Sequence, residues 1–525
     1  MTQKRHIRLG FLTGFIALFL TACAGSRPAT VSVDDPFSSF AATEVLRTGF
    51  ENISDRYIET TSPSVFVFDG LNGLGAIDPA LTVEHGDDTI VMKVAGDVIA
   101  DFPLPKDTDM KAWVDLTVRA AGISRMHSVD LSMASPEKIY EAIFDGILSN
   151  LDIYSRYAGA EEAVKNRAKR EGFGGIGIRF RASDDAAVVT FVVPETPARR
   201  AGLKKADRIT HINGQVVAGM NKAEIGDKLR GAIHSRLKLV VARKGSADPL
   251  SFTMTRAHII PNTVTYGQEN GVVFLKISSF NQSTARNVLL KLKRANTRLG
   301  DKVKGIVLDL RGNPGGLLRQ SIKVADLFLA RGRISETHGR HADSMQQYDA
   351  GGRDMAFGRP LVILLDSKTA SAAEVAAAAL QDRGRAVVIG TSSFGKGTVQ
   401  TVLRLPNEGE ITLTWSRLIA PSGYVLHELG VYPAICTSGL EADDTRARQV
   451  IDNFLAKRVR TAAVMEAWRK TSYQDKKQRQ DLRAFCPPER RRLATDAKIA
   501  QWLIEDRALY ARALNLSTSA AASAR

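Results

Sequence analysis

The sequence predicts a multidomain protein that joins α+β modules to an α/β core, and three observations support this prediction. The 525 residues exceed the size at which one hydrophobic core keeps growing, so several domains are expected. Between residues 172 and 257, short apolar runs separated by Gly, Pro and Asn are typical of a small, mostly β domain. From residue 258 to about 435, strand-like and helix-like segments alternate, which is typical of an α/β core.

The N-terminal residues have the pattern of an export signal. Three basic residues precede a short apolar run that ends in Leu-Thr-Ala-Cys23, which is typical of a secretory signal peptide. The last four residues resemble the bacterial lipobox, whose cysteine is acylated. We therefore expect a lipoprotein signal peptide (1–22), lipidation of Cys23 and a tether (23–38). An ordinary signal peptide with a chance cysteine is the alternative. An acyl anchor would hold the protein on a membrane of the bacterial periplasm, and Ala24 favours the outer membrane.

Periodicity and composition divide the rest of the chain. Apolar residues recur every three or four positions over 39–58 and 136–170, which predicts helices, and runs such as 64–68 and 90–94 between them are strand-like. In chain order we expect a helical N-terminal region with a β insert (39–171), the β domain (172–257), the α/β core (258–440) and a basic helical C-terminal extension (441–525).

The formal net charge of +16 limits the classes of partner. A basic balance suits nucleic acid, anionic lipid or an acidic protein. The charges are scattered rather than gathered into one basic stripe, and export would separate the protein from nucleic acid. We therefore expect a solvated basic surface and no nucleic-acid partner.

Two cysteines remain if Cys23 is acylated. Cys436 and Cys486 could form a disulfide, because an exported compartment permits one. Two buried free thiols are the alternative that the sequence leaves open.

Residues 366–374, named the serine segment here, contain a candidate nucleophile. Ser371 follows a predicted buried strand and precedes a predicted helix. Glu374 lies three residues further on, so a capping box that only closes the helix end is the alternative role for this serine. Backbone N–H groups at a helix N-terminus can also stabilise an oxyanion. Ser371 is therefore well placed to attack a carbonyl carbon.

A serine hydroxyl needs a base, and residues 393–398, named the lysine turn, offer Lys396. Lysine acts as a base only if burial lowers its pKa. Phe394 could supply an apolar wall, and Gln400 would lie on the same face of an extended chain and could orient the amine. A lysine exposed on a turn is one alternative. A phosphate-binding P-loop is another, but Gly397 replaces the required Ser or Thr and a β-like run follows.

Residues 311–316, named the glycine turn, follow another predicted buried strand. Their amides could donate to an oxyanion beside the amide of Ala372, and a plain connecting loop is the alternative. The glycine spacing does not match a dinucleotide fingerprint. No two histidines have metal-ligand spacing, so no metal or other cofactor is expected. His427 is expected to be a surface or packing residue.

Together these segments resemble the carboxyl-terminal processing peptidases, serine proteases with a Ser-Lys dyad. The resemblance covers roughly residues 136–435 and implies a crotonase/ClpP-like α/β protease core. It implies that Ser371 is the nucleophile, Lys396 the general base and Gln400 the residue that orients the lysine, with an acyl-enzyme on the serine. The matching stretches are 145–157, 308–316, 369–375 and 394–400, and the implied oxyanion-hole amides are those of Ala372 and of Gly315 or Gly316.

The β domain resembles the PDZ module of this family. A PDZ domain would add the substrate tail as a strand and bind its terminal carboxylate with backbone amides. A β domain that only packs against the core is the alternative. The residues implied in carboxylate binding are Gly174, Gly175, Ile176 and Gly177.

The chain departs from the family pattern at three places. Ala373 stands where many relatives have serine, Ala434 where an aspartate usually follows the proline, and 417–423 lacks the usual tyrosines. These departures affect the edges of the substrate cleft rather than the dyad.

The sequence thus predicts a lipid-anchored serine endopeptidase that cuts exported or envelope proteins near their C-termini. The family resemblance implies protein substrates bound by their tails and an adaptor protein as a further partner. The alternatives are an inactive PDZ scaffold, which loss of Ser371 or Lys396 would have favoured, and a nucleotide-dependent envelope protein. The oligomeric state is left open.

Overall fold

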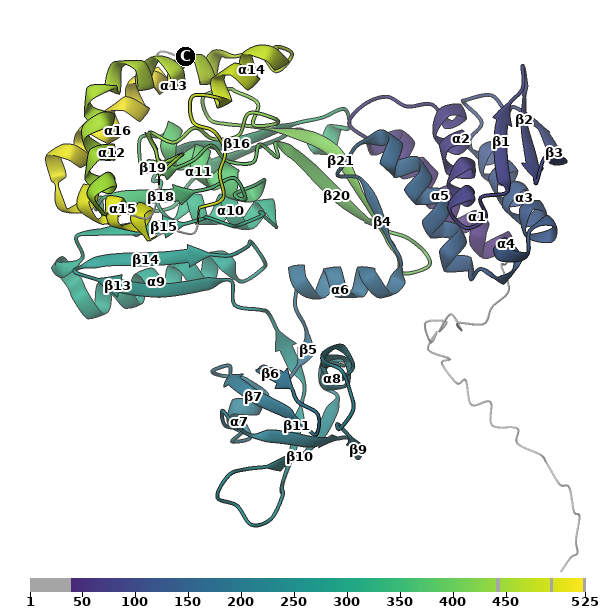
Figure 1. The fold of residues 1–525 in the computed structure, drawn as a ribbon, viewed down its shortest axis with the longest axis horizontal. Helices are drawn as coiled ribbons and strands as arrows, with labels where there is room; N and C mark the ends of the chain where they lie inside the picture. Colours follow the sequence, from purple (N-terminus) through teal and green to yellow (C-terminus); the bar gives the residue numbers. More distant parts are fainter. Residues whose placement is uncertain (1–38, 441–443, 492–493, 523–525) are drawn as a thin grey trace, which may run out of the picture.

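The computed structural model describes residues 39–440, 444–491 and 494–522. The expected signal peptide (1–22), the lipidation site Cys23 and the tether (23–38) lie outside the described residues. Figure 1 shows an elongated molecule, with the N-terminal helices at one end, the α/β core and the C-terminal helices at the other, and the small β domain below and between them. In the described ranges, no helix has the length and apolar character needed to cross a membrane.

The N-terminal unit has a hydrophobic core of its own, built mainly from four helices. The strand expected at 64–68 is wrong, because this run lies in helix α2. Proline suits the first turn of a helix, and Phe66, Val67 and Leu71 are buried at helical spacing. The β insert is the antiparallel sheet β1-β2-β3. The elements are α1 (Ser39–Arg56), α2 (Pro63–Gly73), β1 (Leu81–His85), β2 (Thr89–Val94), β3 (Asp97–Pro103), α3 (Met110–His127), α4 (Val129–Met133) and α5 (Pro136–Leu151).

The small β domain is a sheet of order β11-β10-β8-β7-β6 that encloses a separate core. Two short strands, β5 and β12, pair with each other where the chain enters and leaves the domain. Helix α6 and strand β4 connect it to the N-terminal unit (Figure 1). The elements are β4 (Arg156–Ala158), α6 (Ala160–Arg170), β5 (Phe173–Gly175), β6 (Ile178–Ala182), β7 (Ala187–Val192), α7 (Pro197–Arg200), β8 (Arg208–Ile212), β9 (Gln215–Val216), α8 (Lys222–Leu229), β10 (Arg236–Ala242), β11 (Leu250–Thr255) and β12 (Ala257–Ile259).

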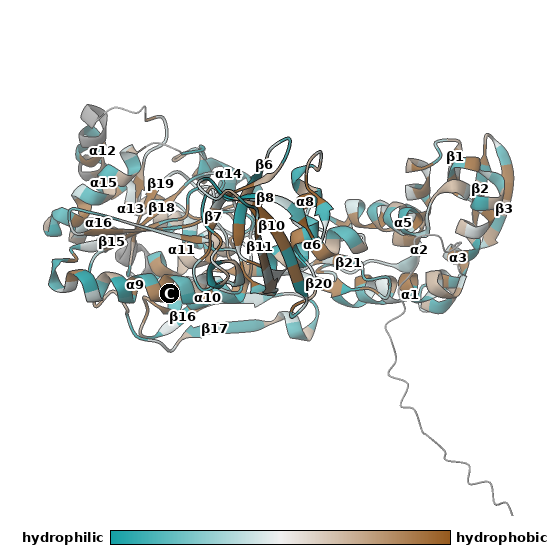
Figure 2. Ribbon diagram, turned by 90° about the horizontal axis from the view of Figure 1, so that it is seen from below, coloured by the Kyte–Doolittle hydropathy of each residue, from teal (hydrophilic) through white to brown (hydrophobic). Residues whose placement is uncertain are grey.

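The α/β core is a six-stranded sheet of order β13-β14-β15-β18-β19-β22. Strands β14 to β22 in this order are parallel to their neighbours, and β15, β18 and β19 are wholly buried, as expected of a sheet covered by helices on its faces. Figure 2 shows hydrophilic residues along the outward face of α9, whose apolar side packs against the core. The elements are β13 (Val264–Glu269), β14 (Val272–Ile277), α9 (Thr284–Leu299), β15 (Gly305–Asp309), α10 (Leu318–Asp326), β18 (Leu361–Leu365), α11 (Ala372–Asp382), β19 (Val387–Gly390) and β22 (Ile435–Cys436).

A second sheet links the core to the N-terminal unit. Its order is β17-β16-β21-β20, and β4 also pairs with β21. The long ribbon of β20 and β21 reaches across the molecule (Figure 1), and Leu405, Ile411 and Leu413 belong to the N-terminal hydrophobic core. The elements are β16 (Gly332–His338), β17 (Gln346–Ala350), β20 (Thr398–Arg404) and β21 (Glu410–Ile419).

The C-terminal extension is helical, as predicted, and packs against the core instead of projecting from it. Trp468, Leu503 and other apolar side chains of the extension are buried in the same hydrophobic core as the α/β sheet. A disulfide joins Cys436, at the end of β22, to Cys486 of the extension. The elements are α12 (Asp444–Ala456), α13 (Arg458–Lys470), α14 (Lys476–Arg483), α15 (Thr495–Glu505) and α16 (Arg507–Ala522).

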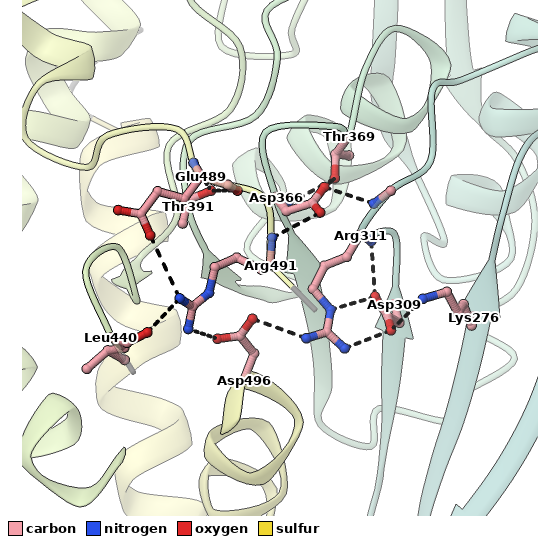
Figure 3. Close-up of polar contacts among 11 residues, drawn as sticks. Lys276, Asp309, Arg311, Asp366, Thr369, Thr391, Leu440, Glu489, Arg491 and Asp496 are labelled. Atoms are coloured by element: carbon pink, nitrogen blue, oxygen red, sulfur yellow. Dashed lines mark hydrogen bonds and ion pairs between the residues drawn. The ribbon is translucent and has the colours of Figure 1, made fainter. Parts of the chain in front are cut away.

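A buried charge network fastens the extension to the glycine turn and to the serine segment (Figure 3). Asp496 is fully buried and accepts from Arg311 at 3.1 Å and from Arg491 at 3.2 Å. Arg311 also pairs with Asp309 on both carboxylate oxygens, each at 2.9 Å. The amide of Arg491 donates to Asp366 at 3.3 Å. These contacts hold residues far apart in the sequence at fixed positions beneath one edge of the sheet.

We expect Asp496→Asn to lower the free energy of unfolding by about 3 kcal/mol, because two buried arginines then share one carboxylate fewer. Urea denaturation followed by circular dichroism measures this value. The matched control is Asp481→Asn, which breaks an exposed pair with Lys477 in the same extension and should cost less than about 1 kcal/mol. Equal losses in the two variants would contradict a structural role for the buried network.

Candidate active site

The three chemical segments meet at one edge of the core sheet. The glycine turn follows β15, the serine segment follows β18 and the lysine turn follows β19. These strands are adjacent and parallel, so their carboxyl ends lie at the same edge. The topology therefore brings the glycine turn, the serine segment and the lysine turn together at this edge.

Ser371 caps the N-terminus of α11 in a strained backbone conformation. Its φ of 56° and ψ of −123° are rare for a residue with a side chain and cost of order 1–3 kcal/mol. Every residue of α11 is buried, whereas Ser371 is partly exposed. The fold therefore presents one hydroxyl to solvent at the start of a helix that is otherwise enclosed.

The glycine turn lies directly against the serine. A β-carbon added to Gly315 would come within 2.8 Å of the Ala370 oxygen and 2.9 Å of the Ser371 β-carbon, and its φ of +100° also favours glycine. The amide of Ala370 donates to the Asn313 oxygen at 2.9 Å. A glycine is thus required here because two backbones approach closely.

The structure distinguishes the amides expected to form an oxyanion hole. The Gly315 amide donates to Oδ1 of Asn313 at 2.9 Å, so it is already occupied. The amides of Ala372 and Gly316 have no acceptor among the described residues and are free to donate. Ala372 and Gly316 therefore remain the candidate donors, and Gly315 instead supplies the close approach of the turn.

Lys396 is partly buried and lies over an aromatic ring. Its Nζ is 4.5 Å from the ring centroid of Tyr154, a residue just before β4. Burial lowers the pKa of the Lys396 amine and Arg156 lowers it further, while Asp152 and Glu374 oppose the shift. The side chain of Phe394, expected to supply an apolar wall, is 47% exposed, and the aromatic ring found beside the amine is that of Tyr154. The direction of the pKa shift is the one that a lysine base requires.

Gln400 does not bind the lysine in this structure. Its Nε2 donates to Thr398 at 2.9 Å and to Thr414 at 3.2 Å, and Thr414 donates in turn to Asp152 at 3.1 Å. The expectation of a shared face assumed an unbroken extended chain. Lys396 precedes the first residue of β20, and the register shift beside Gln400 leaves Trp415 of β21, not a residue of β20, as the extra residue. The expected contact is absent from the described residues.

Glu374 connects the serine segment with the lysine turn. Its carboxylate is fully buried, and Oε2 accepts from the Ser371 amide at 2.6 Å and from the Lys396 amide at 2.9 Å. The capping-box interpretation found the first of these contacts but could not reveal the second. The side chains of Ser371 and Lys396 are not hydrogen-bonded to each other within the described residues.

Sequence reasoning also missed the aromatic surroundings of the lysine. The ring of His427 lies 6.2 Å from Tyr154 and 6.1 Å from Tyr473 of the C-terminal extension. Of the two roles expected for His427, at the surface or in packing, the structure shows packing. Tyr154 falls in a stretch that resembles the family, so a signal existed there, but nothing in the sequence placed its ring on Lys396.

The predicted carboxylate-binding loop of the small β domain is shorter than expected. Gly174 and Gly175 lie in β5 and pair with β12, so they form part of the connection to the core. A β-carbon on Gly174 would come within 2.0 Å of the Gly231 oxygen. Ile176 and Gly177 remain as the residues directly before β6, which lies at the edge of the sheet in the described chain. A peptide strand could add at this edge, beside α8.

Comparison with known proteins assigns two parts of the chain. Residues 271–437 match the model of peptidase family S41, and residues 188–243 match the model of the PDZ domain. Both matches fall where the structure shows the α/β core and the small β domain. They give no support to the inactive scaffold, and PDZ-domain recognition supports the expected fold of residues 172–257.

The chain is also similar to named proteases. It is 36% identical over 313 residues to the carboxy-terminal-processing protease of Bartonella bacilliformis, covering 59% of this chain and 72% of that one. It is 31% identical over 304 residues to carboxy-terminal processing protease CtpA of Bacillus subtilis, covering 57% and 64%. A solved photosystem II D1 C-terminal processing protease is 25% identical, with 71% and 92% covered and a TM-score of 0.35. The chain therefore belongs to the carboxy-terminal processing proteases of peptidase family S41, which are serine-type peptidases.

Proposed function

We propose that this protease uses Ser371 as nucleophile and Lys396 as general base, and that it cuts exported proteins near their C-termini. One observation supports these roles above the others. The serine and lysine segments meet at one sheet edge, with the amides of both residues on the same oxygen of Glu374. The partial burial of Lys396 favours the neutral amine that a base needs.

In the first step, neutral Lys396 accepts the hydroxyl proton of Ser371 as Oγ attacks the scissile carbonyl carbon. The amides of Ala372 and Gly316 donate to the oxyanion that forms, at the N-terminus of α11 where the helix dipole favours negative charge. Substrate binding has to draw the Lys396 amine from the Tyr154 ring toward the hydroxyl, as catalytic hydrogen bonds often tighten only in the complex.

In the second step, the protonated lysine gives its proton to the leaving amine and an ester forms on Ser371. Water then attacks the ester carbonyl carbon as Lys396 accepts a proton from it. The carbonyl carbon–Oγ bond breaks, and Lys396 returns the proton to Oγ of Ser371. Gln400 would reach the lysine only after exchanging its contacts with Thr398 and Thr414. No cofactor is needed for either step.

The PDZ domain would select substrates by their tails. Strand β6 offers an unpaired edge, and the amides of Ile176 and Gly177 precede it. A C-terminal segment added to this edge would place its carboxylate at those amides. Family resemblance favours envelope proteins as substrates and an adaptor protein as an additional partner.

Wild-type protein should cleave an unfolded protein with an apolar C-terminus, whereas Ser371→Ala should not, because the nucleophile is lost. Blocking the terminal carboxylate as an amide should lower kcat/KM by about tenfold or more, since a charged hydrogen-bond acceptor is removed. Mass spectrometry of the fragments measures both effects. Equal cleavage by wild type and Ser371→Ala would remove the serine from the mechanism, and insensitivity to amidation would contradict tail recognition.

The pH dependence of kcat/KM should report the ionisation of Lys396. At low pH Lys396 is an ammonium and cannot accept a proton, so kcat/KM should rise with pH through the pKa of Lys396. Because burial lowers that pKa, the rise should occur below the pH at which a free lysine titrates. Lys396→Arg should be inactive at every pH, since arginine stays protonated. A substantial residual activity in this variant, measured with a fluorogenic peptide, would contradict the base assignment.

We also propose that the protein is a lipoprotein of the bacterial periplasm, anchored through Cys23, with the outer membrane favoured. The basic and apolar N-terminal pattern and the lipobox-like sequence support this proposal. An acyl anchor would leave the tether between the membrane and the first described helix, α1.

Cys23→Ser should move the protein from the membrane fraction to the soluble periplasmic fraction, because the acylated thiol is lost. Incorporation of a labelled fatty acid should be seen in wild type and absent from the variant. Labelled fatty acid in Cys23→Ser, or unchanged membrane association, would contradict anchoring at this residue.

A further inference from the structure

The carboxylate of Glu374 is surrounded by hydrogen-bond donors from two segments. In addition to the two amides on Oε2, Oε1 accepts from the Gly395 amide at 2.6 Å and from the Ser393 hydroxyl at 2.5 Å. Four donors on a fully buried carboxyl leave no acceptor for a carboxyl proton. Burial raises the pKa of Glu374, but these donors and Arg483 oppose that shift. The donor set favours the ionised form.

This carboxylate determines the position of the Ser371 backbone relative to the Lys396 backbone. Ser371 and Lys396 are 25 residues apart and belong to the start of α11 and to a turn between β19 and β20. Because one oxygen accepts from both amides, a shift of either backbone by a fraction of an ångström lengthens one of these hydrogen bonds. One further backbone contact, from Phe394 to Thr369 at 2.9 Å, supports the same junction.

A buried negative charge requires a compensating partner, and the C-terminal extension supplies it. Arg483, the last residue of α14, donates to the Ser393 oxygen at 2.9 Å and to the Leu429 oxygen. Gly430 packs into the same place. A β-carbon there would lie 3.1 Å from Oε1 of Glu374 and 3.2 Å from Nη1 of Arg483. The guanidinium therefore holds Ser393 of the lysine turn and Leu429 together beside the Glu374 carboxylate.

The position of Arg483 is itself fixed. The disulfide between Cys436 and Cys486 lies three residues beyond it, and Trp468 of α13 donates to the Gly430 oxygen at 3.2 Å. All of α14 lies outside residues 271–437, the part that matches the peptidase family model. The family match therefore gives no role to this arginine.

We propose that Glu374 and Arg483 form a positioning clamp for the dyad, with Glu374 holding the Ser371 and Lys396 segments together and Arg483 holding the lysine turn against them. The clamp rests on the proposed roles of Ser371 and Lys396. Neither clamp residue touches the reacting atoms. Its effect on the reaction is to keep the hydroxyl and the amine within reach of each other.

Glu374→Gln keeps the size of the side chain but removes the charge and two acceptor positions. Without these contacts the Ser371 and Lys396 segments are held less firmly. We expect kcat to fall about a hundredfold with KM little changed, since a misplacement of about 1 Å costs that much. The acid limb of the kcat profile should also move to lower pH. The Glu374 charge favours the ammonium form of Lys396, whereas Asp152, Arg156 and Tyr154, the other groups facing the amine, are unchanged.

Arg483 provides the second test. Arg483→Met should lower kcat, and Arg483→Lys should restore part of it, because lysine keeps the charge but cannot reach two carbonyl oxygens with a planar fork. The matched control is Arg469→Met, which breaks a buried 2.9 Å pair with Asp382 at the far end of α11. It should lower stability while leaving kcat per folded molecule and the pH profile at wild-type values.

All variants are purified as the mature protein, checked by circular dichroism, and assayed on one peptide over pH beside Ser371→Ala and Lys396→Arg. Suppose that Ser371→Ala and Lys396→Arg are inactive. Wild-type kcat values and pH profiles in Glu374→Gln and Arg483→Met would then overturn the clamp. Activity in Ser371→Ala or Lys396→Arg would overturn the proposed function instead. If Glu374→Gln does not fold, the Arg483 variants decide. The clamp predicts that kcat falls from wild type to Arg483→Lys and again to Arg483→Met. A kcat of the control Arg469→Met as low as that of Arg483→Met would also overturn the clamp.

Discussion

The parallel pairing of β15, β18 and β19 is the constraint on which the rest of the site depends. It places three loops at one edge of a buried sheet, although their residues are separated by long stretches of chain. Each loop then contributes a different chemical group: the glycine turn a free amide at Gly316, the serine segment a hydroxyl and the lysine turn an amine. Backbone hydrogen bonds between the loops, together with the Glu374 carboxylate that accepts from two of them, set how closely these groups approach.

Much of this arrangement follows from local sequence patterns. The apolar runs that become β15 and β18 are bounded by glycine and polar residues, and the alternation with helices indicates a parallel sheet whose loops converge. Ser371, Lys396 and the glycine turn are identifiable on this basis. The strand predicted at 64–68 is wrong. The β-branched and aromatic residues of this run favour a strand, but Pro63 and the packing of α2 make it helical.

The remaining features depend on contacts that no local pattern encodes. Gln400 donates to Thr398 and Thr414 of its own ribbon, and the side chain of Asn313 occupies the Gly315 amide. The ring of Tyr154 lies on Lys396 although Tyr154 belongs to the loop between α5 and β4, and the pairing of β4 with β21 fixes the end of that loop. The C-terminal extension has amphipathic helices, which indicate an apolar face but not the surface that covers it. Its place in the core could be learned only from the fold.

The joint formed by β5 and β12 makes the PDZ domain an insertion. The chain enters through β5 and leaves through β12, and these strands are paired, so the two ends of the domain are neighbours. The flanking parts of the chain are therefore held together at one point whatever the domain contains. A module attached in this way can change its sequence, and even its size, without altering the spacing of the parts that carry the chemistry. Evolution can thus vary which tails are recognised independently of how they are cut.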